Sequence, residues 1–129
     1  MKKTFKKEER LCNKSLLNKL FHSGSSFVVY PFRMVYMGVA LEKVQSPVSV
    51  VISVSKRRFK AAPHRNRIKR LIREAYRQQK SIALYPFMES KSSGMLLAIQ
   101  YVGKEELPFA TVWTKMEKAL AQLINENNQ

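Results

Sequence analysis

Arginine and lysine crowd the stretch from Pro63 to Arg77, "PHRNRIKRLIREAYR", which carries six of these residues and one glutamate. Arginine presents a planar fork of N–H donors that matches two oxygens of a phosphate group. Over residues 56–80, eleven Lys or Arg face a single acid, Glu74, so pairing within a helix cannot neutralise the charge. This stretch therefore predicts binding to a polyanion, and nucleic acid is the polyanion that we expect.

Residue types that carry out catalysis are few in this chain. It has two histidines and one cysteine, and all nine of its acidic residues are glutamates. Nucleophilic catalysis needs a nucleophile, a base and a group that orients the base, and the sequence indicates no such set around His22, His64 or Cys12. It also has neither the spacing of a zinc site nor a glycine-rich phosphate loop. We expect no catalytic and no metal-ligating residue in the protein.

Length and charge favour a single RNA-binding domain spanning residues 1–129. The chain has 45% hydrophobic residues and a net charge of +15, which fits one domain with a modest core. The charge is uneven: residues 1–20 carry +5 and residues 56–80 carry +10, whereas residues 81–129 carry −1. No secretory signal and no membrane-spanning run is predicted, so we expect a cytoplasmic protein with a flexible basic arm at residues 1–12.

Apolar periodicity predicts the elements that must position these side chains. The expected elements are a helix at 13–22, a strand region at 27–41 interrupted near Pro31, a strand at 48–55, a helix opening at Pro63, a loop at 86–94, a strand at 95–102 and a helix at 111–125. The order is α-β-β-α-β-α, with the first strand region open to a split in two. Helices and strands around one small sheet predict an α+β sandwich.

The basic helix is predicted to have two different sides. Apolar residues recur at helical spacing on one side, at Ile68, Leu71, Ile72 and Ala75. At about 100° per residue, the other side carries Asn66, Lys69, Arg70, Arg73 and Arg77. Aromatic residues outside this helix allow a second mode of binding, because rings stack on the bases of a single strand; core packing is the alternative for each of Phe21, Phe27, Phe32 and Tyr36.

Two segments of the chain resemble the bacterial ribonuclease P protein component. The segment "RNRIKRLIREAYR" follows "SVSKR" and a short basic connector, and "LLNKLFHSG" matches the first helix of the family with its closing glycine. The resemblance covers nearly the whole chain and is strongest from Val48 to Arg77. It implies a central mixed β-sheet covered by helices, with a left-handed β-α-β crossover.

The resemblance also implies a function. The protein would join a catalytic RNA that removes the 5′ leader from precursor tRNA and gives the mature 5′ end. The chemistry of this ribonucleoprotein endoribonuclease would belong to the RNA and to Mg²⁺ held mainly by that RNA. The implied partners are the ribonuclease P catalytic RNA and precursor tRNA, with no membrane and no protein partner required.

Site residues follow from the resemblance by position. The residues expected to face the catalytic RNA are Arg65, Asn66 and Arg67, which match an Arg-Asn-Arg motif of the family, with Lys69, Arg70, Arg73 and Arg77. The residues expected to bind the leader in a cleft are Leu17, Phe21, Val35, Tyr36, Lys56 and Arg57. The chain departs from the family at Leu17, where an aromatic is common, at Val35, where a tyrosine is frequent, and at Gln100-Tyr101, where a basic pair is frequent.

Two other functions are compatible with a basic helix. A ribosomal or ribosome-assembly RNA-binding protein would co-purify with ribosomal RNA and would not stimulate leader removal. A DNA-binding regulator would place the helix in the major groove and would be competed by duplex DNA. Its weakness is the spread of arginine over a whole helix face, since base readout needs only a few side chains that reach the bases.

Overall fold

The fold is a four-stranded sheet with helices on both faces. It is a computed structural model that describes residues 10–11, 13–40, 46–89, 91 and 93–128. Its elements are α1 (Lys14–Ser23), β1 (Ser25–Val29), β2 (Phe32–Val39), β3 (Val48–Val54), α2 (Ala62–Gln79), the π-helical turn η3 (Lys80–Leu84), α3 (Tyr85–Glu89), β4 (Gly94–Tyr101) and α4 (Phe109–Asn127). The predicted element order is confirmed, and the first strand region is split in two, into β1 and β2.

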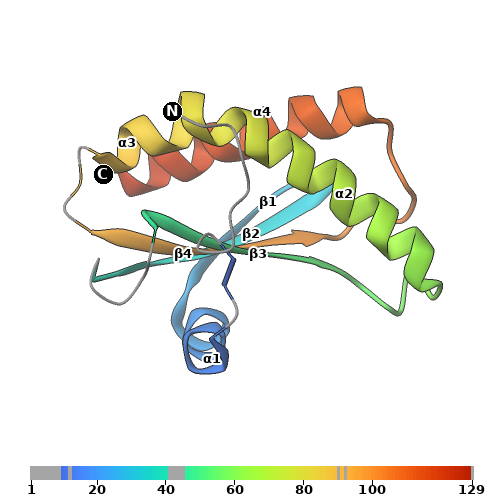
Figure 1. Cartoon of the computed structure of the whole chain (residues 1–129), viewed down its shortest axis with the longest axis horizontal. Helices are drawn as coiled ribbons and strands as arrows, with labels where there is room; N and C mark the ends of the chain where they lie inside the picture. The colour runs from blue at the N-terminus through green and yellow to red at the C-terminus, as the bar shows by residue number, and fades with distance from the viewer. Residues whose placement is uncertain (1–9, 12, 41–45, 90, 92, 129) are drawn as a thin grey trace.

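The sheet is mixed, as predicted. Its strand order is β1-β2-β4-β3, with β1–β2 and β2–β4 antiparallel and β3–β4 parallel. The two parallel neighbours are joined by a crossover through α2, η3 and α3, which lie with α4 over one face of the sheet, while α1 lies on the other face (Figure 1). The left-handedness of this crossover stays a prediction.

Each face of the sheet has its own apolar core, because successive side chains of a strand point to opposite faces. On the face covered by α2 and α4, Val48, Val50 and Val54 belong to the larger core, whose members are at most 7% exposed. On the α1 face, the smaller core consists of Leu11, Leu20, Val35, Leu96 and Ala98. α1 is therefore held by a small contact area, and part of the sheet beside it is left open.

Both ends of α1 are capped by hydrogen bonds to the backbone. The Asn13 side chain accepts hydrogen bonds from the backbone N–H groups of Ser15 at 2.9 Å and Leu16 at 3.2 Å, as an N-cap does. At the other end, the N–H of Gly24 donates to the carbonyl of Leu20 at 2.8 Å. A Cβ at position 24 would lie 2.4 Å from that carbonyl oxygen, so the close return of the chain requires glycine.

The loop predicted at residues 86–94 is wrong in its first part. The basic helix continues through η3 into α3, which ends at Glu89. Leu84 and Met88, four residues apart, are 0% and 3% exposed, so a helical face buries both. Pro86 is the second residue of α3 and lies just after the π-helical turn, where the regular i to i−4 hydrogen-bond pattern is interrupted. Proline therefore marks the start of a helical segment here and not a loop.

The flexible arm predicted for residues 1–12 is wrong for Arg10 and Leu11. Arg10 forms a parallel bridge with Val50 at the outer edge of β3, and the N–H of Leu11 donates to the Val50 carbonyl at 2.8 Å. The Leu11 side chain is only 5% exposed and closes the core under α1. Residues 1–9 and Cys12 lie outside the described residues.

Candidate nucleic-acid interface

α2 turns its apolar side to the sheet and its basic side outward. Ile68, Ile72 and Ala75 are at most 1% exposed, while Asn66 and Arg70 on the other side are exposed. The helix takes this orientation because burying the apolar side stabilises the fold and leaves the charges hydrated. The predicted division of the helix into two sides is confirmed.

Three cations of this outward side are available to a partner. Arg70 and Arg73 are exposed and Lys69 is half-buried. Among the residues that the structure describes, none of the three side chains has a hydrogen-bond or ion-pair partner. The glutamates of the described chain thus leave the middle of the helix positively charged, which is the condition that a phosphate-binding surface requires.

The other three arginines of the predicted RNA side are held by the protein itself. Arg65 donates from Nη1 to the carbonyl oxygens of Phe59 at 2.8 Å and Lys60 at 2.9 Å, and so fixes the connector that leads into α2. Arg67 donates from Nε to both carboxylate oxygens of Glu106, at 3.1 and 3.3 Å. Arg77 pairs with Glu74 one turn earlier, with Nε 3.1 Å from Oε2.

The Arg77 contact changes the titration of Glu74. Hydrogen bonds from Arg77 and then from Gln78 hold the pKa of the Glu74 carboxyl below its usual range, and the same carboxylate raises the pKa of Arg77. Glu74 therefore stays ionised at neutral pH and partly screens the end of the basic side. The uncompensated charge is concentrated at Lys69, Arg70 and Arg73.

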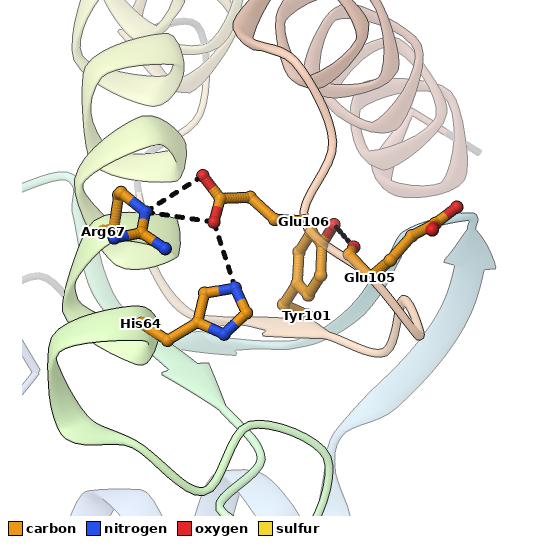
Figure 2. A network of polar contacts seen from close by, with 5 residues as sticks. All are labelled: His64, Arg67, Tyr101, Glu105 and Glu106. Atoms are coloured by element: carbon orange, nitrogen blue, oxygen red, sulfur yellow. Dashed lines mark hydrogen bonds and ion pairs between the residues drawn. The ribbon is translucent and has the colours of Figure 1, made fainter.

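A second polar contact ties the start of α2 to the segment that follows β4 (Figure 2). The Oε1 atom of Glu106 lies 3.0 Å from Nε2 of His64 and 3.1 Å from Nε of Arg67. Nearby, the Tyr101 hydroxyl donates to the carbonyl of Glu105 at 2.6 Å, and burial raises the pKa of Tyr101 to about 12. Glu106 thus orients Arg67 and His64 at the end of the basic surface.

The opposite face of the sheet has an open polar row beside α1. Val28, Arg33, Gln100 and Ser53 are paired across all four strands, so their side chains lie on one face. Arg33 donates from Nη1 to Oε1 of Gln100 at 2.7 Å and lies 3.4 Å from the Ser26 hydroxyl. Ser53 and Gln100 also line a hollow of about 200 Å³ at the ends of β3 and β4.

Phe21 of α1 is the residue of the predicted leader set that is both aromatic and accessible. Its side chain is 48% exposed, although an apolar ring of this size is normally buried. Leu17, one turn earlier, is half-buried and packs against the small core under α1. Lys56 and Arg57 are exposed just beyond the end of β3, where cations can reach the open row.

Val35 and Tyr36 do not form an accessible pair at this place. Val35 is 3% exposed and lies beneath α1. Tyr36 follows it in β2 and therefore points to the opposite face, where its hydroxyl donates to Oε1 of Glu126 at 2.6 Å. Burial, and then the hydrogen bond to Glu126, raise the pKa of Tyr36. The structure thus keeps Tyr36 away from Phe21 and the open row.

The chain was compared with known protein families and relatives. The family model described as Ribonuclease P matches residues 5–124. The ribonuclease P protein component of Porphyromonas gingivalis is 38% identical over 117 residues, covering 91% of this chain and 84% of that protein. The corresponding protein of Chlorobium phaeobacteroides is 36% identical over 106 residues, covering 78% and 73%. The chain belongs to the ribonuclease P protein family.

Solved structures of ribonuclease P proteins have the same fold. The Staphylococcus aureus RNase P protein superposes with a TM-score of 0.66 at 20% identity, covering 89% of this chain and 94% of that one. The Thermotoga maritima RNase P protein gives a TM-score of 0.66 at 24% identity, with coverages of 88% and 96%. At these identities the comparison shows the fold, and the α+β class expected from the sequence is confirmed.

The structure adds two cations to the residues that we expected from the ribonuclease P resemblance. Arg33 was missed, although the alternation of Phe32 and Met34 on either side of it requires the Arg33 side chain to point to the other face of the sheet. Arg10 was missed because it was assigned to a flexible arm, and only its bridge to Val50 places it. For Arg33 the signal was present in the sequence, and for Arg10 it was not.

Hydropathy of the described helices was also compared with the requirement for crossing a membrane. No helix in the described part of this ribonuclease P family member is both long enough and apolar enough to span a bilayer. The 18-residue α2 carries six of the 24 Lys and Arg residues of the chain.

Proposed function

We propose that this chain is the protein subunit of a ribonucleoprotein that removes the 5′ leader of precursor tRNA. The proposal is supported by membership of the ribonuclease P protein family and by the outward side of α2. The observation that carries it is the group formed by the half-buried Lys69 and the exposed Arg70 and Arg73, whose side chains have no partner among the described residues. Uncompensated arginines along one helix face need a polyphosphate partner.

In this proposal the catalytic RNA contacts the outward side of α2. Lys69, Arg70, Arg73 and Asn66 bind backbone phosphates directly. Arg67 is a positioning residue, because Glu106 already occupies its guanidinium. Arg65 is also a positioning residue, since it holds the connector through two carbonyl oxygens. Arg77 contributes less than Arg73, because Glu74 neutralises it.

The single-stranded leader lies across the open row of the other face. Phe21 is exposed there and offers a ring for base stacking. Arg33 and Gln100 offer a paired guanidinium and amide at the centre of the sheet, and Lys56 and Arg57 add charge at its end. This assignment keeps Phe21, Lys56 and Arg57 of the leader residues expected from the sequence and adds Arg33 and Gln100. It leaves out Leu17 and Val35, which pack in the small core under α1, and Tyr36, which points to the opposite face of the sheet.

Mg²⁺ belongs to the RNA in this proposal. Among the described residues, no group of three or more His, Cys, Asp or Glu side chains could hold a metal ion. The carboxylate of Glu106 is taken up by Arg67 and His64, so these side chains do not fit a resident metal site. The residues of the chain bind and orient RNA, and no step of bond cleavage is assigned to them.

Reconstitution tests the proposed function directly. The purified protein is combined with the ribonuclease P RNA of the same organism at low Mg²⁺, and cleavage of a precursor tRNA is followed by gel. We expect no cleavage by the protein alone and a strong stimulation of cleavage by the RNA. A protein that leaves the RNA unstimulated, and that binds ribosomal RNA equally well, would remove the proposal.

A further inference from the structure

A basic hollow lies where α2 meets the outer edge of β3. It has a volume of about 200 Å³ and is lined by Arg10, Leu11, Val50, Val51, Ile52, Lys69 and Arg73. Lys69 and Arg73 are four residues apart in α2 and therefore lie on one side of the helix. Arg10 reaches the hollow from the chain segment that pairs with Val50. Of the described residues that line the space, three are cations and none is acidic.

The outer edge of β3 adds a backbone donor to this hollow. The Val50 carbonyl accepts the N–H of Leu11 at 2.8 Å, so the backbone groups of Val50 face the outer edge and not β4. Backbone groups along a strand alternate with a period of two residues, and Ile52 therefore directs its N–H to the same edge. Within the described chain, that N–H has no hydrogen-bond partner outside the sheet.

Cations beside an outward backbone N–H form a site for a phosphate. Phosphate oxygens accept hydrogen bonds from guanidinium, ammonium and backbone N–H groups together. Here Lys69 and Arg73 are not engaged by any described residue, and the apolar walls from Leu11 and Val51 lower the dielectric around the charges. A solvated basic surface would need neither the concave shape nor the backbone donor.

We propose that this hollow binds one backbone phosphate of the catalytic RNA, held by Arg10, Lys69, Arg73 and the N–H of Ile52. The inference rests on the proposed function and deepens it, because it extends the RNA surface from α2 to the edge of the sheet. It also gives the chain segment at Arg10 and Leu11 a role, which is to place a cation opposite α2. The RNA backbone then bridges two parts of the protein that are far apart in sequence.

Inorganic phosphate is the probe for the site itself. We would titrate the ¹⁵N-labelled full chain with phosphate while chloride keeps the ionic strength constant, and follow the Ile52 amide resonance. We expect a saturable shift of this resonance that is weakened about tenfold or more in Arg73→Ala. Arg70→Ala is the matched control, since Arg70 belongs to the same helix but does not line the hollow. An unmoved Ile52 amide, or equal weakening in both variants, overturns the proposal.

RNA binding decides whether the phosphate belongs to the RNA backbone. In the complex with catalytic RNA, we expect Arg10→Ala to flatten the dependence of log Kobs on log salt by about one ion. If Arg10→Ala leaves affinity and slope unchanged while free phosphate still moves Ile52, the site takes free phosphate and the RNA assignment is overturned. Failure of the proposed function can be told apart from failure of the phosphate site and from failure of its assignment to RNA. In that case the wild-type protein would not stimulate leader cleavage at all.

Discussion

Individual arginines of α2 have different roles, although the sequence gives them the same chemistry. Arg70 and Arg73 project from the helix without a partner in the described chain, whereas Arg65 and Arg67 are bound to carbonyl and carboxylate oxygens. A side chain already bound within the protein must give up that contact before it binds phosphate. We therefore assign direct RNA contact to Arg70 and Arg73, and positioning to Arg65 and Arg67.

Arg70→Ala and Arg73→Ala should each weaken binding to the catalytic RNA. Each phosphate contact releases condensed cations, so each loss should lower the salt slope of log Kobs by about one. Binding is measured by filter retention over a series of KCl concentrations. Lys118→Ala is the control, because Lys118 is an exposed lysine of α4. Slopes equal to that of the wild type in both arginine variants would place α2 outside the interface.

Arg65→Ala should lower the stability of the fold more than it weakens a direct contact with RNA. The variant loses two hydrogen bonds from a charged donor to the carbonyls of Phe59 and Lys60. Because Arg65 is partly exposed, we expect the free energy of unfolding to fall by only about 1 to 2 kcal/mol. Urea denaturation measures the loss. Arg70→Ala breaks no hydrogen bond or ion pair with a described residue and should change the free energy of unfolding by less than about 0.5 kcal/mol. Equal stability of the two variants would contradict the positioning role.

Elements were predictable where one rule of periodicity applied. The run of β-branched residues from Val48 to Val54 correctly predicted β3, and the helical spacing of apolar residues correctly predicted α1. The segment from Lys80 to Glu89 was not predictable, because a π-helical turn shifts the register and hides the helical spacing of Leu84 and Met88.

A site residue in a strand can be predicted only if the sequence shows to which face of the sheet its side chain points. The family resemblance places both Val35 and Tyr36 in the leader cleft, but adjacent strand residues face opposite sides of the sheet. Val35 lies under α1, and Tyr36 reaches Glu126 of α4. The same alternation places the Arg33 side chain on the face of the sheet that carries α1. The contact of Arg10 with Val50 joins residues forty positions apart, and no local pattern encodes it.

The placement of α1 on the sheet predicts a specific effect of Phe21→Ala. The ring is 48% exposed, so its loss should leave folding nearly unchanged but remove a stacking surface beside the open row. We expect weaker binding of leader-bearing precursor tRNA and unaltered binding of mature tRNA by the holoenzyme. Ile82→Ala, at a 68% exposed position of η3, serves as the control. Equal losses on both tRNAs would remove Phe21 from leader recognition.

At the scale of the whole molecule, charge is separated in space. Apart from the buried Lys80, the basic residues of 56–80 belong to α2 and to the segment between β3 and α2, while residues 81–129 are close to neutral. RNA can thus bind the outward surface of α2 without covering the surface of α4. The cost of this arrangement is repulsion among neighbouring cations in the free protein, because Lys69 and Arg73 are four residues apart and Arg70 and Arg73 are three apart.

This repulsion should be measurable as a stability cost that salt removes. Replacing Arg70 and Arg73 together by glutamine should raise the free energy of unfolding at low ionic strength by about 1 kcal/mol or less. The gain should shrink as sodium chloride is added, because chloride screens the charges of the wild type, and phosphate is avoided since it would occupy the basic hollow. The control is the double variant of α4 in which Lys115 and Lys118 are both replaced by glutamine, and the thermal unfolding of the two double variants is compared. If the α2 variant gains no stability over the α4 variant, the crowded charges of α2 do not destabilise the free protein. Charge repulsion on α2 would then give no reason to expect a polyphosphate partner.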